Sequence, residues 1–411
     1  MKDIDEKIID DNGNIVFYNQ NKKSPANKDE TIKLVACGDT GAVRKLEKIV
    51  IEKGPLHILG EMKTVLDRAD IRYINLEAVF SNQGAPLNRI PVFRVKPEAF
   101  TLIQEINPTV ACLANNHMFD YGPEAFNETV WLLDQNNIAH FGAGNSIESA
   151  LRPALVEFKG IKIGFIGFRE KESKNFDHNG VITPEINQDI IIQNIRALKT
   201  RTDLVILSLH FGWEYQFYPS PRDVKLCRQF IDEGATIVLG HHPHYPQGVE
   251  VYSNGLICYS LGNYIWDQNF IGHTDASFAV EIDLNKNGIT SAKVIPFKLT
   301  KDYKLTIQQK KQAFFELNRY SFILTQKRKL SEKWYFISRD KIIVFARSLK
   351  SIFRRCDGDW KRFLLALKSN NTYRFRYTAL SLLIYFITLR FLYYEFAKRY
   401  RRVIEKGRTP D

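Results

Sequence analysis

The chain has 411 residues, of which 44% are hydrophobic and 25% are charged. This composition is typical of a globular protein of about two to three domains, and it excludes a wholly disordered chain, a collagen-like fibre and a polytopic membrane protein. Five cysteines without a CxxC pair argue against a disulfide framework or a zinc ribbon and favour a reducing compartment. The acidic N-terminus lacks an apolar run, so no secretory signal is predicted.

The net charge of +12 is distributed unevenly along the chain. Residues 301–411 contain 27 Lys and Arg against 9 Asp and Glu, whereas the rest has 31 basic and 37 acidic residues. A mildly acidic body with a strongly basic tail suggests that the tail meets an anionic surface, either a membrane or a polyanion. The alternative is a solvated helical extension.

Residues 1–30 are polar and are predicted to form a mobile arm or a short β-ribbon. From residue 32 onward, short runs rich in Val, Ile and Leu alternate with stretches of helical periodicity, and this alternation predicts an α/β domain over residues 31–300. The predicted strands are 32–37, 72–80, 109–114, 160–168, 203–212, 236–242 and 256–264, and the predicted helices are 55–69, 122–136, 187–199 and 221–233. A hairpin is predicted at 278–297, where two alternating runs flank a turn that ends in glycine.

The tail, residues 301–411, is predicted to be a basic, aromatic-rich helical extension. Its run 377–394 is apolar apart from Arg390 and lies between clusters of arginine and lysine. A spanning helix needs about 20 apolar residues, so this run favours an interfacial membrane helix or a helix packed against the body or a partner. The predicted location is the cytoplasm or the inner face of the membrane.

Polar side chains follow the apolar parts of five predicted strands, which end at residues 37, 76, 114, 209 and 239. They are Asp39, Glu77, Asn116 with His117 and Asp120, His210, and His242 with His244. In open α/β sheets ligands bind outside the carboxyl ends of the strands, so we expect these side chains at one rim. Imidazoles and carboxylates without a thiolate suit Mn, Fe or Zn. Two such ions about 3.5–4 Å apart can clamp an in-line displacement, and Glu77 is the candidate bridge.

Each of these residues also has a structural interpretation. Asp39 could cap a helix, Asn116 could be a turn residue, and a single histidine at the end of a strand is often structural. The ordered coincidence over five strands favours the metal site. His242 and His244 add weight, because alternate residues of an extended segment point the same way.

Five segments resemble the CapA-like family of poly-γ-glutamate and capsule biosynthesis proteins. They are GD (38–39), INLEAVFS (74–81), LANNHMFDYG (113–122), HFGWEY (210–215) and the stretch from GHHPHYPQG to YSLGNYIWD (240–267). The domain of this family is a variant of the calcineurin-like metallophosphoesterase fold. The resemblance implies a β-sandwich flanked by helices, with a dinuclear metal site on its rim.

The resemblance also implies roles for individual positions. The implied metal ligands are Asp39, Glu77, Asn116, His210, His242 and His244. His117 matches the acid or leaving-group stabiliser, which Asp120 could orient, and Tyr215 and Asn263 lie in motifs near the site. Metallophosphoesterases usually carry a histidine two residues after the first aspartate, where this chain has Gly41. One of the two metal positions is therefore expected to be weak, unless His241 or Glu214 substitutes.

The implied function is that of a metal-dependent hydrolase or transferase in capsule or exopolymer biosynthesis. Its substrate would be an anionic polymer or a phosphoester, and its partners would be capsule-assembly proteins. The alternative is a non-catalytic polymer-binding or scaffold component on the same fold. Nucleic-acid binding would depend on the charge of the tail alone, and no RNA- or DNA-binding motif supports it.

Overall fold

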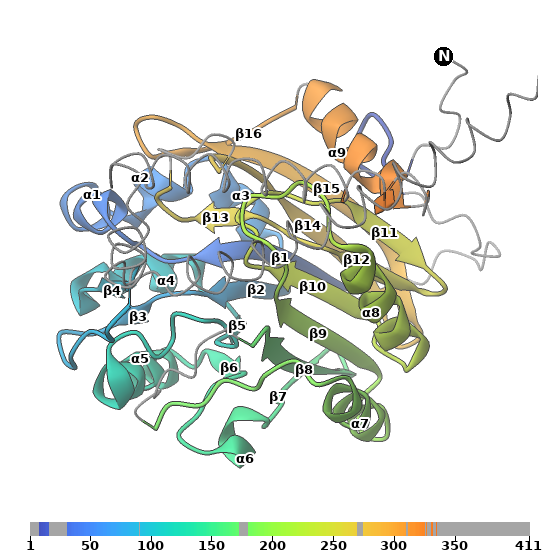
Figure 1. Cartoon of the computed structure of the whole chain (residues 1–411). Helices are drawn as coiled ribbons and strands as arrows, with labels where there is room; N and C mark the ends of the chain where they lie inside the picture. The colour runs from blue at the N-terminus through green and yellow to red at the C-terminus, as the bar shows by residue number, and fades with distance from the viewer. Residues whose placement is uncertain are drawn as a thin grey trace, which may run out of the picture. The chain divides into compact units, whose positions relative to one another are not determined.

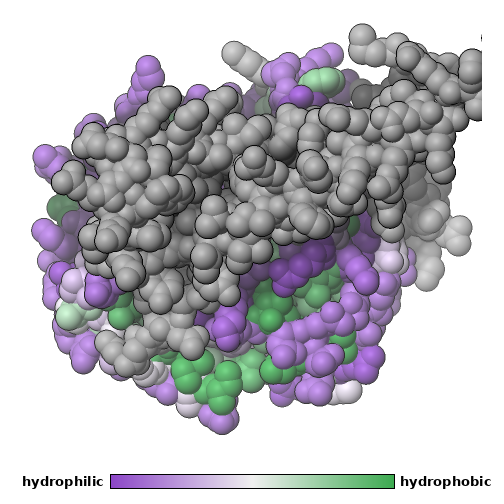
Figure 2. All heavy atoms as spheres, viewed as in Figure 1, coloured by the Kyte–Doolittle hydropathy of each residue, from purple (hydrophilic) through white to green (hydrophobic). Residues whose placement is uncertain are grey.

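The computed structural model describes residues 8–15, 31–89, 91–171, 180–268, 274–309, 311–324, 326, 330, 331 and 334. Nearly all of these belong to one compact unit that reaches Ser331. Two β-sheets form its centre, and helices lie outside them (Figure 1). On the face shown in Figure 2, the surface of the described residues is mainly hydrophilic, with a smaller hydrophobic area.

Within the described residues, the first sheet has eight strands in the order β16-β15-β14-β1-β2-β5-β6, with β13 paired to β1 beside this path. Its strands are β1 (Ile32–Thr40), β2 (Ile71–Leu76), β5 (Val110–Cys112), β6 (Ala139–Phe141), β13 (Asn263–Ile265), β14 (Ala276–Asn285), β15 (Gly288–Leu299) and β16 (Leu305–Ile307). The strands from β1 to β6 in this order run parallel. Because parallel strands are covered on both faces, β1 and β2 are almost continuously buried.

The second sheet has the order β11-β12-β10-β9-β8-β7. Its strands are β7 (Ala154–Phe158), β8 (Ile161–Arg169), β9 (Leu204–His210), β10 (Ile237–His241), β11 (Val249–Tyr252) and β12 (Gly255–Cys258). Strands β8, β9, β10 and β12 are parallel, and β7 and β11 pair antiparallel at the two edges. A short ribbon of β3 (Val79–Phe80) and β4 (Arg94–Val95) lies apart from both sheets.

Helices cover the outer faces of both sheets (Figure 1). The described helices are α1 (Lys45–Lys53), α2 (Pro55–Leu59), α3 (Met62–Asp67), η2 (Pro97–Phe100), α4 (Thr101–Ile106), α5 (Gly122–Gln135), α6 (Ile147–Ala150), α7 (Gln188–Lys199), α8 (Pro221–Asp232) and α9 (Lys311–Leu324). Apolar side chains of α1 to α5 form one core cluster with the first sheet. Helices α7 and α8 contact strands β9 and β10 of the second sheet.

The predicted α/β class, with sheets flanked by helices, is confirmed. Three predicted elements are divided: residues 55–69 form α2 and α3, 72–80 form β2 and β3, and 256–264 contribute to β12 and β13. The helix breaks at Gly60, whose φ of 49° is not helical. Glycine is required at this position, because a Cβ would lie 2.3 Å from the carbonyl oxygen of Leu305 in β16. The domain boundary at residue 300 stays a prediction, although β16 and α9 follow it within the compact unit.

No described helix combines the length and the apolar character needed to cross a bilayer. Most of the predicted arm and the whole run 377–394 lie outside the described residues.

Candidate metal centre

The carboxyl ends of five parallel strands meet at one edge of the two sheets. Strands β1, β2 and β5 come from the first sheet, and β9 and β10 from the second. In register, Asp39 lies beside Asn75, and His210 lies beside His241. The sheets therefore bring together side chains that are far apart in the sequence.

Two sets of three ligand-type side chains lie at this edge, and the donor atoms of each set are within 4.8 Å of one another. The sets are Glu77, His210 and His242, and Asp39, Glu77 and His244. Glu77 belongs to both, as a bridging carboxylate would. The amide oxygen Oδ1 of Asn116 lies 2.9 Å from Nε2 of His210, beside the first set. The six predicted ligands thus lie together, and their role as ligands stays a prediction.

Glu77 is a buried carboxylate whose charge is not balanced by a hydrogen bond from a described residue. It is fully buried, and neither carboxylate oxygen accepts a hydrogen bond from a described residue. Burial, followed by the negative charge of Asp39, raises the pKa of Glu77 well above its usual value. A buried charge is costly unless it is paired, so a divalent ion between the two sets would fit these residues.

Burial and neighbouring charges set the protonation of the other ligand candidates. Burial, followed by the positive charge of His242, lowers the pKa of His210 well below its usual value. Burial acts to raise the pKa of Asp39, but close contacts with His241 and His244 outweigh it and lower that pKa. Burial acts to lower the pKa of His244, but its contact with Asp39 outweighs burial and raises that pKa. A neutral imidazole and an ionised carboxylate are the forms that bind metal, so His210 and Asp39 are in the binding form, whereas a protonated His244 would have to release its proton.

His117 and Asp120 form a buried pair next to this centre. Nδ1 of His117 lies 2.7 Å from Oδ2 of Asp120, and its Nε2 lies 3.4 Å from the amide nitrogen of Asn116. Asp120 also accepts hydrogen bonds from the backbone of Phe93 at 2.7 Å and from Nε of Arg89 at 3.0 Å. The orientation predicted for this pair therefore matches its contacts, whereas its catalytic role stays a prediction.

Two residues that hold this loop are not among the predicted site residues. Arg89 contacts Asp120, the carbonyl of Asn116 and Nδ1 of His117. Asn115 donates to the carbonyl of Leu76 at 2.7 Å and accepts from the backbone of His117 at 3.0 Å. The position of Asn115 in the strand-end motif NNH was a usable signal, but nothing local in the sequence points to Arg89.

The loops that carry the last ligands have unusual backbone conformations. His242, His244 and Tyr215 have φ values of 94°, 57° and 60°, a region that costs free energy for residues other than glycine. Nδ1 of His244 lies 2.8 Å from Oδ1 of Asn263, and the ring of Tyr215 stacks on His244 at 6.0 Å. Tyr215 and Asn263 thus support His244, which agrees with their predicted place beside the site.

The two proposed substitute ligands do not join the described donor sets. His241 is fully buried, and its Nε2 lies 3.0 Å from the hydroxyl of Tyr73 beneath the site. The negative charge of Glu214 acts to raise the pKa of Glu77 and of His244, but the Glu214 carboxylate is in neither donor set.

Trp266 occupies the space beside Gly41. A Cβ at Gly41 would lie 2.7 Å from Cζ3 of Trp266 and 3.0 Å from Cβ of Ala78. The indole is buried and stacks on His244 at 5.9 Å. A larger side chain at position 41 would require this ring to move.

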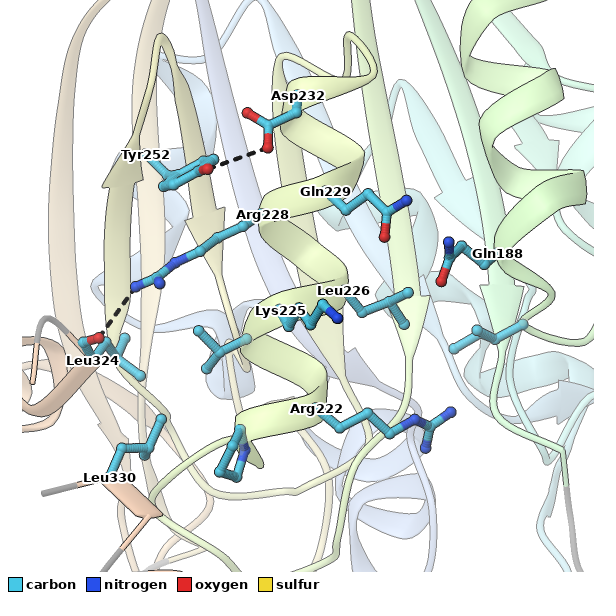
Figure 3. A pocket seen from close by; sticks show the side chains of 13 residues that line it. Gln188, Arg222, Lys225, Leu226, Arg228, Gln229, Asp232, Tyr252, Leu324 and Leu330 are labelled. Atoms are coloured by element: carbon cyan, nitrogen blue, oxygen red, sulfur yellow. Dashed lines mark hydrogen bonds between the residues drawn. The ribbon is translucent and has the colours of Figure 1, made fainter. Parts of the chain in front are cut away.

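A separate cavity of about 950 Å³ lies along α8 and involves none of the predicted site residues (Figure 3). Two of its cations are already paired, Arg222 with Glu170 and Arg228 with Glu250. The ligand-type side chains gather at the strand ends, outside this cavity.

The fold and the clustered side chains define an α/β protein of two sheets with a candidate metal centre at its edge. Residues 33–268 match the family described as "Bacterial capsule synthesis protein PGA_cap". This match covers more than half of the chain, so the chain belongs to that family, and the CapA-like resemblance is confirmed.

Known relatives agree with this assignment. The chain is 29% identical to the "Capsule biosynthesis protein CapA" of Bacillus anthracis over 66% of its own length and 68% of that protein. It is also 29% identical to the "PGA biosynthesis protein CapA" of Bacillus subtilis, over 66% and 72% of the two chains. A "Probable polyglutamine synthesis accessory protein" of Mycobacterium tuberculosis is 31% identical over 60% and 70%.

Among solved structures, the calcineurin-like phosphoesterase YfkN of Bacillus subtilis is similar with a TM-score of 0.38 and 13% identity, over 74% of this chain and 98% of that chain. A hypothetical protein from Thermus thermophilus gives a TM-score of 0.43 and 14% identity, over 65% and 99%. Likeness at this level carries no functional argument.

Proposed function

We propose that the chain is a metal-dependent hydrolase in capsule or exopolymer biosynthesis. The observation that carries this proposal is Glu77, a buried carboxylate that belongs to both donor sets and accepts no hydrogen bond from a described residue, although Nε2 of His210 lies 3.4 Å from one of its oxygens. Two divalent ions, of Mn, Fe or Zn, would be held by Asp39, Glu77, Asn116, His210, His242 and His244. Such ions polarise a scissile phosphoryl or carbonyl group and lower the pKa of a bound water.

In this proposal His117 protonates the leaving group. Asp120 accepts the hydrogen bond of Nδ1, which fixes the ring and leaves Nε2 on the side of Asn116. A positioned acid of this kind needs only a short reach to the departing oxygen or nitrogen. The contacts of Arg89 hold the carboxylate of Asp120 in place from the other side.

The two metal positions are proposed to be unequal. The position of His210 and His242 has Asn116 as an additional donor. The position of Asp39 and His244 lies on the side where Trp266 fills the space at Gly41, so it lacks a comparable fourth protein ligand among the described residues. The second ion would therefore bind more weakly than the first.

The proposed substrate is an anionic polymer of the poly-γ-glutamate kind or a phosphoester. Membership in the capsule synthesis family supports the polymer, and the carboxylate and imidazole donors of the centre suit either bond. Proposed partners are proteins of capsule assembly, together with an anionic membrane surface contacted by the basic tail.

The test combines metal analysis of the purified full chain with a screen of phosphoesters and γ-glutamyl polymers. The double variant His242→Ala with His244→Ala removes one ligand from each donor set, so it should lose metal and activity. His140→Ala is the control, because this histidine pairs with Asp134 at the surface. Equal metal content in the wild type and the double variant would refute the proposed centre.

The same experiment separates the enzyme from the scaffold alternative. A protein that retains metal and binds the polymer but hydrolyses nothing in the screen would be a binding component. A weakly bound second ion would favour the scaffold alternative only if turnover requires both ions, because the protein would then lack a complete catalytic centre.

A further inference from the structure

The ligand candidates come from two different sheets, and a chain of polar side chains connects these sheets beneath the centre. Oδ1 of Asp39 lies 3.3 Å from Nδ1 of His241, and Nε2 of His241 lies 3.0 Å from the hydroxyl of Tyr73. That hydroxyl lies 2.7 Å from Oγ of Ser208. All four side chains are at most 1% exposed.

This polar chain crosses the interior between the sheets. Asp39 and Tyr73 belong to β1 and β2 of the first sheet, whereas His241 and Ser208 belong to β10 and β9 of the second. The rings of Tyr73 and His241 stack at 5.8 Å with an interplanar angle of 29°. Each hydrogen bond or close contact in the chain therefore also fixes the distance between two strands that carry ligands.

Polar groups are expensive in such a place. A buried hydroxyl or imidazole loses its hydrogen bonds to water, and this free-energy cost is offset only if the group makes hydrogen bonds inside the protein. The neighbouring side chains are apolar, as in the stacking of Phe165 on Tyr73 at 6.4 Å. Apolar residues could fill this space at a lower cost, so the polar chain requires a reason beyond packing.

The two oxygens of Asp39 face different partners. Oδ1 meets His241 and the amide nitrogen of Asn75, at 3.3 and 2.8 Å. Oδ2 faces the ligand loop, where Nδ1 of His244 is 3.2 Å away. Nδ1 of His241 makes no hydrogen bond within the described residues, so it approaches Oδ1 closely beside the hydrogen bond from Asn75. His241 and Asn75 thus hold one oxygen, and the other is directed toward the residues of the centre.

We propose that His241, Tyr73 and Ser208 are positioning residues of the metal centre, which hold the Asp39 carboxylate in its ligand orientation and fix the two sheets at the spacing the ligands need. This inference rests on the proposed function. Among the proposed metal ligands, His241 contacts only Asp39 within the described residues, so it would affect metal binding by orienting that carboxylate. Removing the Tyr73 hydroxyl would free Nε2 of His241 and let the imidazole turn away from Asp39.

The test is calorimetric titration of Mn²⁺ into the chelator-treated full chain. Loss of a residue that orients a metal ligand typically weakens metal binding about 10–100-fold, so Tyr73→Phe should show a loss in this range. The matched control is Tyr264→Phe, because Tyr264 is equally buried in the same sheet but its hydroxyl faces Cys37. Control and wild type should bind Mn²⁺ alike.

Two further measurements distinguish positioning from general destabilisation. Urea unfolding of the metal-free variants shows whether each is folded under the conditions of the titration. The midpoint of Tyr73→Phe should lie below that of Tyr264→Phe, because the Tyr73 hydroxyl has two hydrogen-bond partners and the Tyr264 hydroxyl has none among the described residues. Weaker Mn²⁺ binding by Tyr73→Phe that is still fully folded indicates positioning. The double variant His241→Gln with Tyr73→Phe should lose less Mn²⁺-binding free energy than the sum of the two single variants, since both changes interrupt the same polar chain beneath the centre. Ser208→Ala is a milder variant that tests the same chain if Tyr73→Phe does not fold.

The outcomes are separable. A wild type that binds no Mn²⁺ would overturn the proposed centre and this inference with it. A wild type that binds, with Tyr73→Phe and Ser208→Ala equal to it, would overturn this inference alone.

Discussion

The pair of His117 and Asp120 is the feature of single residues most directly tied to turnover. We predict that His117→Ala lowers any hydrolytic activity by about 10²–10⁴-fold, the usual contribution of a general acid, and leaves the metal content unchanged. Nδ1 of His117 is held by Asp120, and the ring is in neither donor set. Steady-state kinetics and metal analysis of the same preparation check this expectation. Full turnover would mean that His117 only holds its loop, and a loss of metal would make it a ligand.

Glu77 gives a second prediction at this scale, for the metal-free protein. Burial, followed by the charge of Asp39, raises its pKa in the folded state, so the folded chain keeps a proton that the unfolded chain releases. The free energy of unfolding should therefore fall as pH rises from the unfolded pKa, about 4.3, toward the folded pKa. Glu77→Gln should lack this decline, which amounts to at most about 1.4 kcal/mol per pH unit.

Urea unfolding with a chelator, at several pH values between about 5 and 8, measures this difference. Glu98→Gln is the control, because Glu98 is exposed at the start of a 3₁₀-helix and should leave the pH profile unchanged. Parallel profiles for the wild type and Glu77→Gln would contradict the assignment of an uncompensated carboxylate.

The ligand candidates could be predicted from the sequence because each lies at the end of a buried strand or within a few residues after it. Tyr73 and Ser208 could not be predicted in this way. Their hydroxyls meet across 135 residues of chain, and each lies within an apolar strand, where it looks like an ordinary packing residue. Arg89 is similar, because its contacts depend on how the loop before β4 folds back onto Asp120.

Among the elements, α8 carries the clearest local stability signal. Its start combines a capping box between Ser220 and Asp223 with Pro221 in the first turn. We predict that Ser220→Ala costs about 1 kcal/mol of unfolding free energy, because a backbone N–H loses its acceptor. Lys225→Ala, on the exposed face of the same helix, should change stability by less than about 0.5 kcal/mol. Equal urea midpoints for the two variants would show that the cap contributes nothing.

The elements that the sequence predicted best are those buried on both faces. Strands β1, β8, β9 and β10 appear as long apolar runs. Strand β7 was missed because it is an edge strand with a largely exposed pattern. The break between α2 and α3 was missed because it depends on the backbone of β16, which is far away in the sequence.

For the whole molecule, the asymmetry of charge leads to a prediction about membranes. Residues 301–411 carry 27 basic and 9 acidic residues. Each basic residue near an anionic bilayer contributes about 1 kcal/mol, an effect that fades within a Debye length of about 8 Å. We predict that the full chain co-sediments with anionic vesicles, and that binding by charge weakens with salt while binding by the apolar run 377–394 persists.

The matched control for this experiment is a truncation after Ser331, which keeps β16 and α9 in the compact unit. It should remain in the supernatant with anionic and neutral vesicles alike. Full-length protein that stays in the supernatant at low and high salt would refute membrane contact by the tail.

The division of the ligand set between two sheets also has a consequence for the order of folding. Asp39, Glu77 and Asn116 come from one sheet, and His210, His242 and His244 from strand ends of the other or the loop that follows. A folding intermediate with only one sheet assembled would contain no complete donor set. Metal would then bind after the rate-limiting step and act mainly by slowing unfolding, since interactions absent from the transition state change the unfolding rate. The metal-bound protein would therefore stay folded longer because it unfolds more slowly, while its folding rate would be nearly unchanged.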